Sequence, residues 1–303
     1  MTTKPFKNDQ LAGLENVEAV KGRSLWQDAM RRLFHNKAAV VSMVLLGIIV
    51  ILAIIAPYLS PYAFDDPDWG YDFPGPPNME MKHWFGTDGN GRDLFVRTLY
   101  GARISLMVGI LATTVSLLIG VTYGATAGYL GGRIDNVMMR IVDMMYSLPF
   151  MFFVILLMVI FGRNIFLIFV ALGAVEWLTM ARIVRGQTLS VKKKEFIEAA
   201  HAVGVPTWKI ILRHIIPNVL GPVIVYMTLT IPQVILTESF LSFLGLGVQE
   251  PMTSWGVLIS EGAKQMESAP WLLIYPAIFL AITLFCFNFI GDGLRDALDP
   301  KDR

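Results

Sequence analysis

Long apolar stretches without charge limit the fold of this chain more than any other feature. Five of them approach or exceed the roughly 20 helical residues that cross a bilayer core of about 30 Å. A sixth, 164–181, contains a single acid, Glu176. Because the stretches are continuous, they predict transmembrane helices rather than the alternating strands of an outer-membrane barrel. The five charge-free stretches are 38–64, 104–132, 144–162, 215–237 and 268–291.

The composition agrees with a membrane protein and excludes several other classes. Charged residues make up only 16% of the chain, against about 25% in a typical soluble domain. A net charge of +1 provides no basic surface for nucleic acid. The single cysteine, Cys286, excludes an internal disulfide, and the four histidines have no partner at metal-ligand spacing. The sequence therefore predicts an all-α polytopic membrane protein that binds no cofactor and no metal itself.

Lysine and arginine predict the orientation of the chain. With the N-terminus in the cytoplasm, 19 of the 25 basic residues fall on the inner side and six on the outer side. The reverse orientation would invert this bias. We therefore expect six transmembrane helices and two cytoplasmic termini. The first 37 residues are hydrophilic, so no cleavable signal peptide is expected.

The spans divide the chain into five predicted parts. A periplasmic loop, rich in proline, glycine and aspartate, is expected to be irregular and to lie on the surface. Within it, residues 88–93 resemble a calcium loop superficially, but Arg92 stands at the third ligand position, so a packed turn is expected instead. The parts are a cytoplasmic arm 1–37, a first transmembrane helix 38–64, the loop 65–100, a membrane domain 101–290 and a cytoplasmic tail 291–303.

The longest inner loop, 182–214, carries its own helical signal. Residues 195–203 predict a short helix with Ala199 and Ala200 among the small residues on one face. Gly204 is expected to end this helix in a left-handed conformation. A helix in such a loop has to pack against something. The membrane surface, attractive to the lysines just before the helix, and a cytoplasmic protein are both open interpretations.

Residues of this loop resemble the EAA loop of binding-protein-dependent ABC importers. The resemblance rests on Glu198-Ala199-Ala200, Gly204 and Pro217. The family pattern ends in I-x-L-P, where this chain has His214-Ile-Ile-Pro217. Other segments are similar to the second permease subunit of oligopeptide and dipeptide importers. They are 22–26 with 36–39, 86–88 with 91–93, 101–106, 238–247 and 291–300.

The resemblance implies a fold, a function and a set of partners. The fold is a type I ABC importer transmembrane domain, here 101–290, with span one as an added helix. The function is that of a permease subunit moving oligopeptides across the inner membrane; dipeptide and nickel importers share most of these motifs. The implied partners are a homologous permease subunit, two cytoplasmic ATPase subunits that bind ATP and Mg, and a periplasmic or surface substrate-binding protein. Residues 198–204 become the coupling helix, seated in a groove of one ATPase.

Three residues are candidates for the transport pathway or its gate. Glu176 is an acid in a transmembrane stretch, and such residues usually face a protein interior or a cavity. It lies six residues before Arg182, so a structural pair or an interfacial position is an alternative. Pro149 is a candidate hinge, with a static kink as its alternative. Glu238 begins the second outer segment, 238–268, where a substrate or an extracytoplasmic partner would arrive; a re-entrant or surface turn is an equal alternative.

Catalytic motifs are absent from the sequence. No G-x-x-x-x-G-K-[ST], H-E-x-x-H or G-x-S-x-G pattern occurs, so the chain is not expected to be an enzyme. Two other classes are alternatives to an ABC permease. An ATP-independent secondary transporter needs intramembrane ionisable groups, and only Glu176 is available. A membrane scaffold gives no reason for the pattern in the inner loop.

Overall fold

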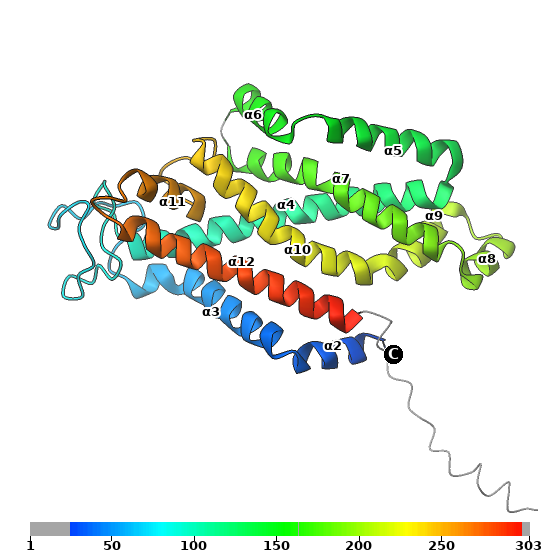
Figure 1. The fold of residues 1–303 in the computed structure, drawn as a ribbon, viewed down its shortest axis with the longest axis horizontal. Helices are drawn as coiled ribbons and strands as arrows, with labels where there is room; N and C mark the ends of the chain where they lie inside the picture. Colours follow the sequence, from blue (N-terminus) through cyan, green and yellow to red (C-terminus); the bar gives the residue numbers. More distant parts are fainter. Residues whose placement is uncertain (1–24, 163, 299–303) are drawn as a thin grey trace, which may run out of the picture.

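The chain folds into an elongated bundle of helices (Figure 1). The computed structural model describes residues 25–162 and 164–298, and the regular elements within these ranges are helices. The predicted arm up to residue 24, Arg163 and the tail after residue 298 lie outside the described residues. In chain order the helices are α2 (Leu25–His35), α3 (Lys37–Leu59), α4 (Leu94–Leu130), α5 (Gly132–Ser147), α6 (Phe150–Phe161), α7 (Ile165–Val191), α8 (Glu195–Ala202), α9 (Thr207–Ile210), the π-helical turn η1 (Ile211–Ile215), α10 (Ile216–Phe243), α11 (Trp255–Lys264) and α12 (Trp271–Leu298).

Five helical spans in the described part are long and apolar enough to cross a membrane. They are α3, α4, α7, α12 and the continuous run α9–η1–α10. The pair α5 and α6 makes a sixth span if it is counted as one, but it bends by 81°. The expected span 144–162 lies within this bent pair, and its break is at Pro149, the residue that the sequence offers as a hinge or kink. The break follows from Pro149, which disfavours a helical conformation at Leu148, and Leu148 is extended here.

Most spans are longer than the apolar stretches that predict them. Helix α7 continues ten residues beyond the expected end at Ala181, and basic side chains in this extension pair with acids of α5. Arg182 Nη2 lies 2.6 Å from Asp143 Oδ1, and Arg185 Nε lies 2.6 Å from Asp135 Oδ1. The chain thus remains helical past the first charged residue, so a charge-free stretch marks the apolar layer and not the helix.

Because helices extend beyond the apolar stretches, the outer segments are shorter than predicted. The loop expected over 65–100 ends at Asp93, whose side chain caps α4 by accepting the backbone N–H of Val96 at 2.8 Å. The segment expected over 238–268 is partly helical, because α10 extends to Phe243 and α11 follows. Helix α11 is anchored by Trp255, which is fully buried and donates its indole N–H to the carbonyl of Thr98 at 3.0 Å.

The centre of the bundle is built by close packing of α4 and α7. Three glycines on one face of α4, at a spacing of four residues, allow the two backbones to approach. A Cβ added at Gly124, the middle one, would lie only 2.4 Å from the carbonyl oxygen of Ala181. Helix α10 also packs on α4, α3 and α12 lie along one side, and α5 and α6 lie along the other (Figure 1). The 60–93 loop and α8 are at opposite ends of the bundle.

Candidate functional sites

Helix α8 is the short helix that the inner loop predicts. Glu195 and Glu198 lie in its first turn and His201 in its last, which suits the helix dipole. The chain leaves the helix at Gly204, where φ is +81°. Only glycine adopts this left-handed conformation freely, so the predicted stop at Gly204 is confirmed.

One side of α8 packs on the bundle and the other side is bare. Ile197 is 3% exposed and belongs to an apolar cluster with residues of α4, α7 and η1. Ala200 is half-buried against the same cluster. Glu198 and Ala199 are exposed, and Val203 is 84% exposed just after the helix. The helix is therefore fixed to the bundle on one side. On its other side it presents a partly apolar surface with no partner among the described residues.

Pro217 lies away from this surface, in the first turn of α10. It follows the π-helical turn η1, in which Ile216 N–H donates to the carbonyl of Ile211, one residue further back than in an α-helix. A proline inside a helix lacks its own N–H and crowds the preceding turn. The wider turn provides the room, so Pro217 shapes the entry into α10 and does not join the exposed face of α8.

The structure brings Glu176 close to the break at Pro149. Glu176 lies on α7 and lines a cavity of about 230 Å³. Leu148 and Phe150, on either side of Pro149, line the same cavity, together with Tyr146 of α5. Two of the three pathway candidates thus come together at one cavity. The rest of its lining is formed by Met145, Phe153, Val175, Leu178 and Thr179.

Glu238, the third candidate, lies elsewhere and is completely enclosed. Its Oε1 accepts hydrogen bonds from Ser242 Oγ and Ser254 Oγ, each at 2.7 Å. Ser254 also caps α11 by accepting the N–H of Val257 at 3.3 Å. Glu238 therefore ties α10 to the start of α11 and lines none of the cavities described here. This geometry is that of a structural anchor.

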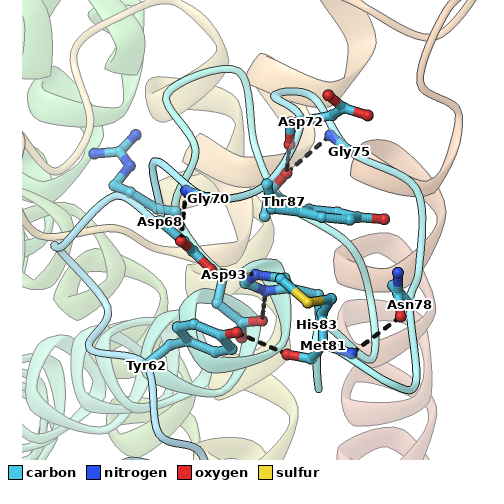
Figure 2. A network of polar contacts seen from close by, with 12 residues as sticks. Tyr62, Asp68, Gly70, Asp72, Gly75, Asn78, Met81, His83, Thr87 and Asp93 are labelled. Atoms are coloured by element: carbon cyan, nitrogen blue, oxygen red, sulfur yellow. Dashed lines mark hydrogen bonds and ion pairs between the residues drawn. The ribbon is translucent and has the colours of Figure 1, made fainter.

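The 60–93 loop contains a polar network that sequence reasoning missed (Figure 2). His83 is fully buried, with Nδ1 2.8 Å from Asp93 Oδ2 and Nε2 3.1 Å from Asp68 Oδ2. Tyr62 stacks on the imidazole with 4.1 Å between ring centroids and donates its hydroxyl to the carbonyl of Met81 at 2.7 Å. The histidine joins two aspartates that are 25 residues apart in sequence. No spacing rule pairs these residues in advance.

The two aspartates of this network have opposite electrostatic environments. Burial raises the pKa of Asp93 above its ordinary value, although the Val96 N–H and the His83 imidazole act against that change. The backbone N–H of Gly70, followed by the imidazole, holds the pKa of Asp68 below its ordinary value. The network thus contains one acid that resists ionisation and one that favours it.

A second charged cluster joins the 60–93 loop to α4 and to the segment between α10 and α11. Asp88 Oδ2 lies 2.8 Å from Arg92 Nε and 3.1 Å from Arg97 Nε. Arg92 Nη2 also reaches Glu250 Oε1 at 3.0 Å. Asp88, the first residue of the calcium-like stretch, is thus engaged by two guanidinium groups. Beside this cluster is a polar cavity of about 170 Å³, which Glu261 of α11 lines and where burial raises the pKa of that carboxyl.

Comparison with known proteins gives the family. The model of the binding-protein-dependent transport system inner membrane component matches residues 120–303. The chain belongs to this family. The model of the N-terminal TM domain of oligopeptide transport permease C also matches the permease, over residues 24–77. The permease is a multi-pass inner-membrane protein, as its apolar stretches predict.

Relatives cover nearly the whole permease. The oligopeptide transport system permease protein OppC of Haemophilus influenzae is 61% identical over 97% of the permease and 94% of that protein. OppC of Escherichia coli is 63% identical over 94% of each chain. The dipeptide transport system permease protein DppC of Bacillus subtilis is 49% identical over 95% of the permease and 90% of that protein. The predicted likeness to this type of permease subunit is confirmed, against the alternatives of a secondary transporter and a scaffold.

A solved structure supports the fold. A chain of the MetNI methionine ABC transporter in inward-facing conformations superimposes with a TM-score of 0.54 and 18% identity, over 67% of the permease and 96% of that chain. At this identity the likeness speaks for the fold alone. The predicted fold class, a type I ABC importer transmembrane domain, is confirmed.

Proposed function

We propose that this permease forms, with a homologous permease subunit, the path by which oligopeptides cross the inner membrane. Two cytoplasmic ATPase subunits drive the movement, and a substrate-binding protein delivers the peptide from outside. ATP and Mg are bound by the ATPases and not by this chain. Support for the cargo comes from relatives named for oligopeptide transport at 61% and 63% identity. The 49% identity to a dipeptide permease supports dipeptides as a second cargo class.

The observation that carries this proposal is the bare face of α8. The helix is fixed to the bundle through Ile197, so a force applied to its outer face is passed to α4, α7 and η1. The positive-inside rule places α8 in the cytoplasm, on the side of the ATPases. We assign Glu198, Ala199 and Gly204 to the surface that contacts an ATPase. Ala200 supports this surface from the buried side, and Pro217 positions α10 behind it.

Purification from native membranes tests the assembly. The tagged permease is solubilised in a mild detergent, and the retained proteins are identified by mass spectrometry. We expect a second permease and two ATPases in equal amounts. The purified complex, placed in liposomes with its binding protein, should accumulate a labelled oligopeptide only when ATP is supplied. Purification of the chain alone, together with uptake that survives deletion of the neighbouring ATPase genes, would overturn the proposal.

A further inference from the structure

Glu176 is an acid without a counterion in the interior of a membrane protein. Among the described residues, its carboxylate has neither an ion pair nor a hydrogen bond. Two other polar groups that line the same cavity already have a partner, because the hydroxyls of Tyr146 and Thr179 bond to each other. Arg182, on the same helix, pairs with Asp143 and stacks on the Tyr146 ring at 4.1 Å from the ring centroid. The carboxylate of Glu176 is therefore free to accept a cation.

The size and lining of the cavity beside Glu176 limit the kind of ligand that can bind there. A carboxylate at membrane depth is costly against lipid and is found facing protein or an aqueous cavity. The cavity beside Glu176 measures about 230 Å³ and is lined mainly by apolar side chains. This is below the roughly 300–1,000 Å³ of pockets that enclose whole small ligands. It therefore suits the end of a larger cationic molecule better than a complete one.

The helix dipoles of the broken span add no net charge at this cavity. Helix α5 ends and α6 begins at the cavity, so a negative helix end and a positive helix end face it together and largely offset each other. The titratable and charged groups near this cavity are Tyr146 of α5, which lines it, Tyr226 of α10, which interacts electrostatically with Glu176, and the Asp143–Arg182 pair beside the Tyr146 ring. Asp143 and Arg182 cancel as a pair. Glu176 is then an acid at this cavity that has no ionic partner among the described residues.

We infer that Glu176 binds the ammonium group at the amino terminus of the peptide while it passes through the permease. The α-amino group has a pKa of about 8, so nearly every free peptide carries this cation at neutral pH. A carboxylate can accept a charge-assisted hydrogen bond from it irrespective of the peptide sequence. The apolar and aromatic lining, with Phe150 and Phe153, accommodates a variable first side chain. This inference rests on the proposed peptide transport.

The test compares two forms of one peptide in the complete importer. The peptide is supplied with a free or an acetylated amino terminus, at concentrations that saturate the binding protein as measured separately for each form. For the free peptide, Glu176→Gln should lower the initial uptake rate about tenfold, which is the scale of one lost charge-assisted hydrogen bond. Glu176→Asp should retain most of the rate. The acetylated peptide should be slow in the wild type and no slower in Glu176→Gln.

Two further measurements keep the test decisive. The ratio of wild-type to Glu176→Gln uptake of the free peptide should decrease as the pH rises through about 8, where the peptide loses its charge. Gln187→Leu removes a polar group of α7 that lines a different groove, so it should affect both peptides equally. Equal slowing of both peptides by Glu176→Gln, or no slowing, overturns the inference.

Other outcomes separate this inference from the proposed function. If Glu176→Gln no longer co-purifies with the second permease, Glu176 is part of a subunit contact and the inference is wrong. If the wild-type importer moves neither form although the binding protein is loaded, peptide transport itself is wrong. Transport of the free peptide by the wild type, with no selective loss in Glu176→Gln, leaves the proposed function intact and removes only the ammonium site.

Discussion

The two ends of the bundle differ in whether the residues that characterise them find their partners within the chain. In the 60–93 loop, His83 has a carboxylate at each ring nitrogen and Asp88 has two guanidinium groups. At the other end, α8 is held by Ile197 and leaves Ala199 and Val203 exposed. The polar groups of His83 and Asp88 are therefore paired within the chain, whereas the exposed face of α8 has no partner among the described residues.

We therefore expect substitutions in the 60–93 loop to affect stability and substitutions on α8 to affect transport. Buried charged groups are costly unless they are paired, so a change in the 60–93 loop should damage the fold. Exposed small residues cost little to replace, so a change on α8 should damage only what α8 touches. Variants at the two ends test this contrast.

The largest expected effect is that of His83→Ala. It leaves the buried Asp93 without its imidazole partner and removes the stack on Tyr62. Removal of one member of a buried pair typically costs about 3–5 kcal/mol. The apparent melting temperature of the purified protein in detergent should decrease markedly. His201→Ala, on the exposed surface of α8, is the control and should change stability by less than about 0.5 kcal/mol. Similar melting temperatures for both variants would remove the contrast.

Ala199→Asp, at the α8 end, should leave stability nearly unchanged and reduce transport. The side chain is exposed, so the fold tolerates a charge there within about 0.5 kcal/mol. A charge buried against an ATPase without a partner should reduce ATP-driven uptake by roughly a hundredfold, on the scale of several kcal/mol for an uncompensated charge. Uptake in liposomes and the melting temperature are measured on the same preparation.

Ser190→Asp is the matched control for this prediction. Ser190 is exposed near the end of α7 but does not lie on α8. We expect near-normal uptake and unchanged stability. Normal uptake by Ala199→Asp, or equal loss in both variants, would show that the exposed face of α8 does not transmit the work of the ATPases.

The sequence predicts the parts of this fold that depend on local chemistry. Apolar stretches locate the spans, and Gly204 marks the end of α8 because a left-handed residue is a backbone property of that position. Pro149 marks the break in the span as a candidate hinge or kink, although hydropathy alone shows one continuous charge-free stretch there. The pairing of Arg182 with Asp143 joins two different helices, so no local pattern predicts it.

The sites depend on contacts that no single segment contains. His83 meets Asp68 and Asp93 only after the loop has folded back on itself, so its role is invisible from spacing. The enclosure of Glu238 likewise requires Ser254, from a segment expected to be an outer loop. Glu176 differs, because an acid in an apolar stretch is conspicuous in the sequence. The cavity beside it lies at the helix break, and Pro149, which marks that break, is also visible in the sequence.

A smaller effect is expected from a pair of glycines. Gly204 has a φ of +81°, so Gly204→Ala should destabilise the end of α8 by about 1–2 kcal/mol. Gly186 is exposed inside α7 with open space around it, so Gly186→Ala should stabilise by about 0.5–1 kcal/mol. Hydrogen exchange of the two helices measures both effects. Gly204→Asn should cost less than Gly204→Ala, because asparagine tolerates the left-handed region.

The smallest effect concerns the order in which two aspartates titrate. The lowered pKa of Asp68 means that it stabilises the loop above its ordinary pKa, and that this contribution is lost as the pH falls through the folded value. The raised pKa of Asp93 has the opposite sign, because its contribution is greatest in acid and is lost as the pH rises through the folded value. Carboxyl ¹³C shifts, assigned with Asp68→Asn and Asp93→Asn, should therefore show Asp93 taking up its proton at a higher pH than Asp68. The reverse order would mean that burial of Asp93 is outweighed by its hydrogen bonds.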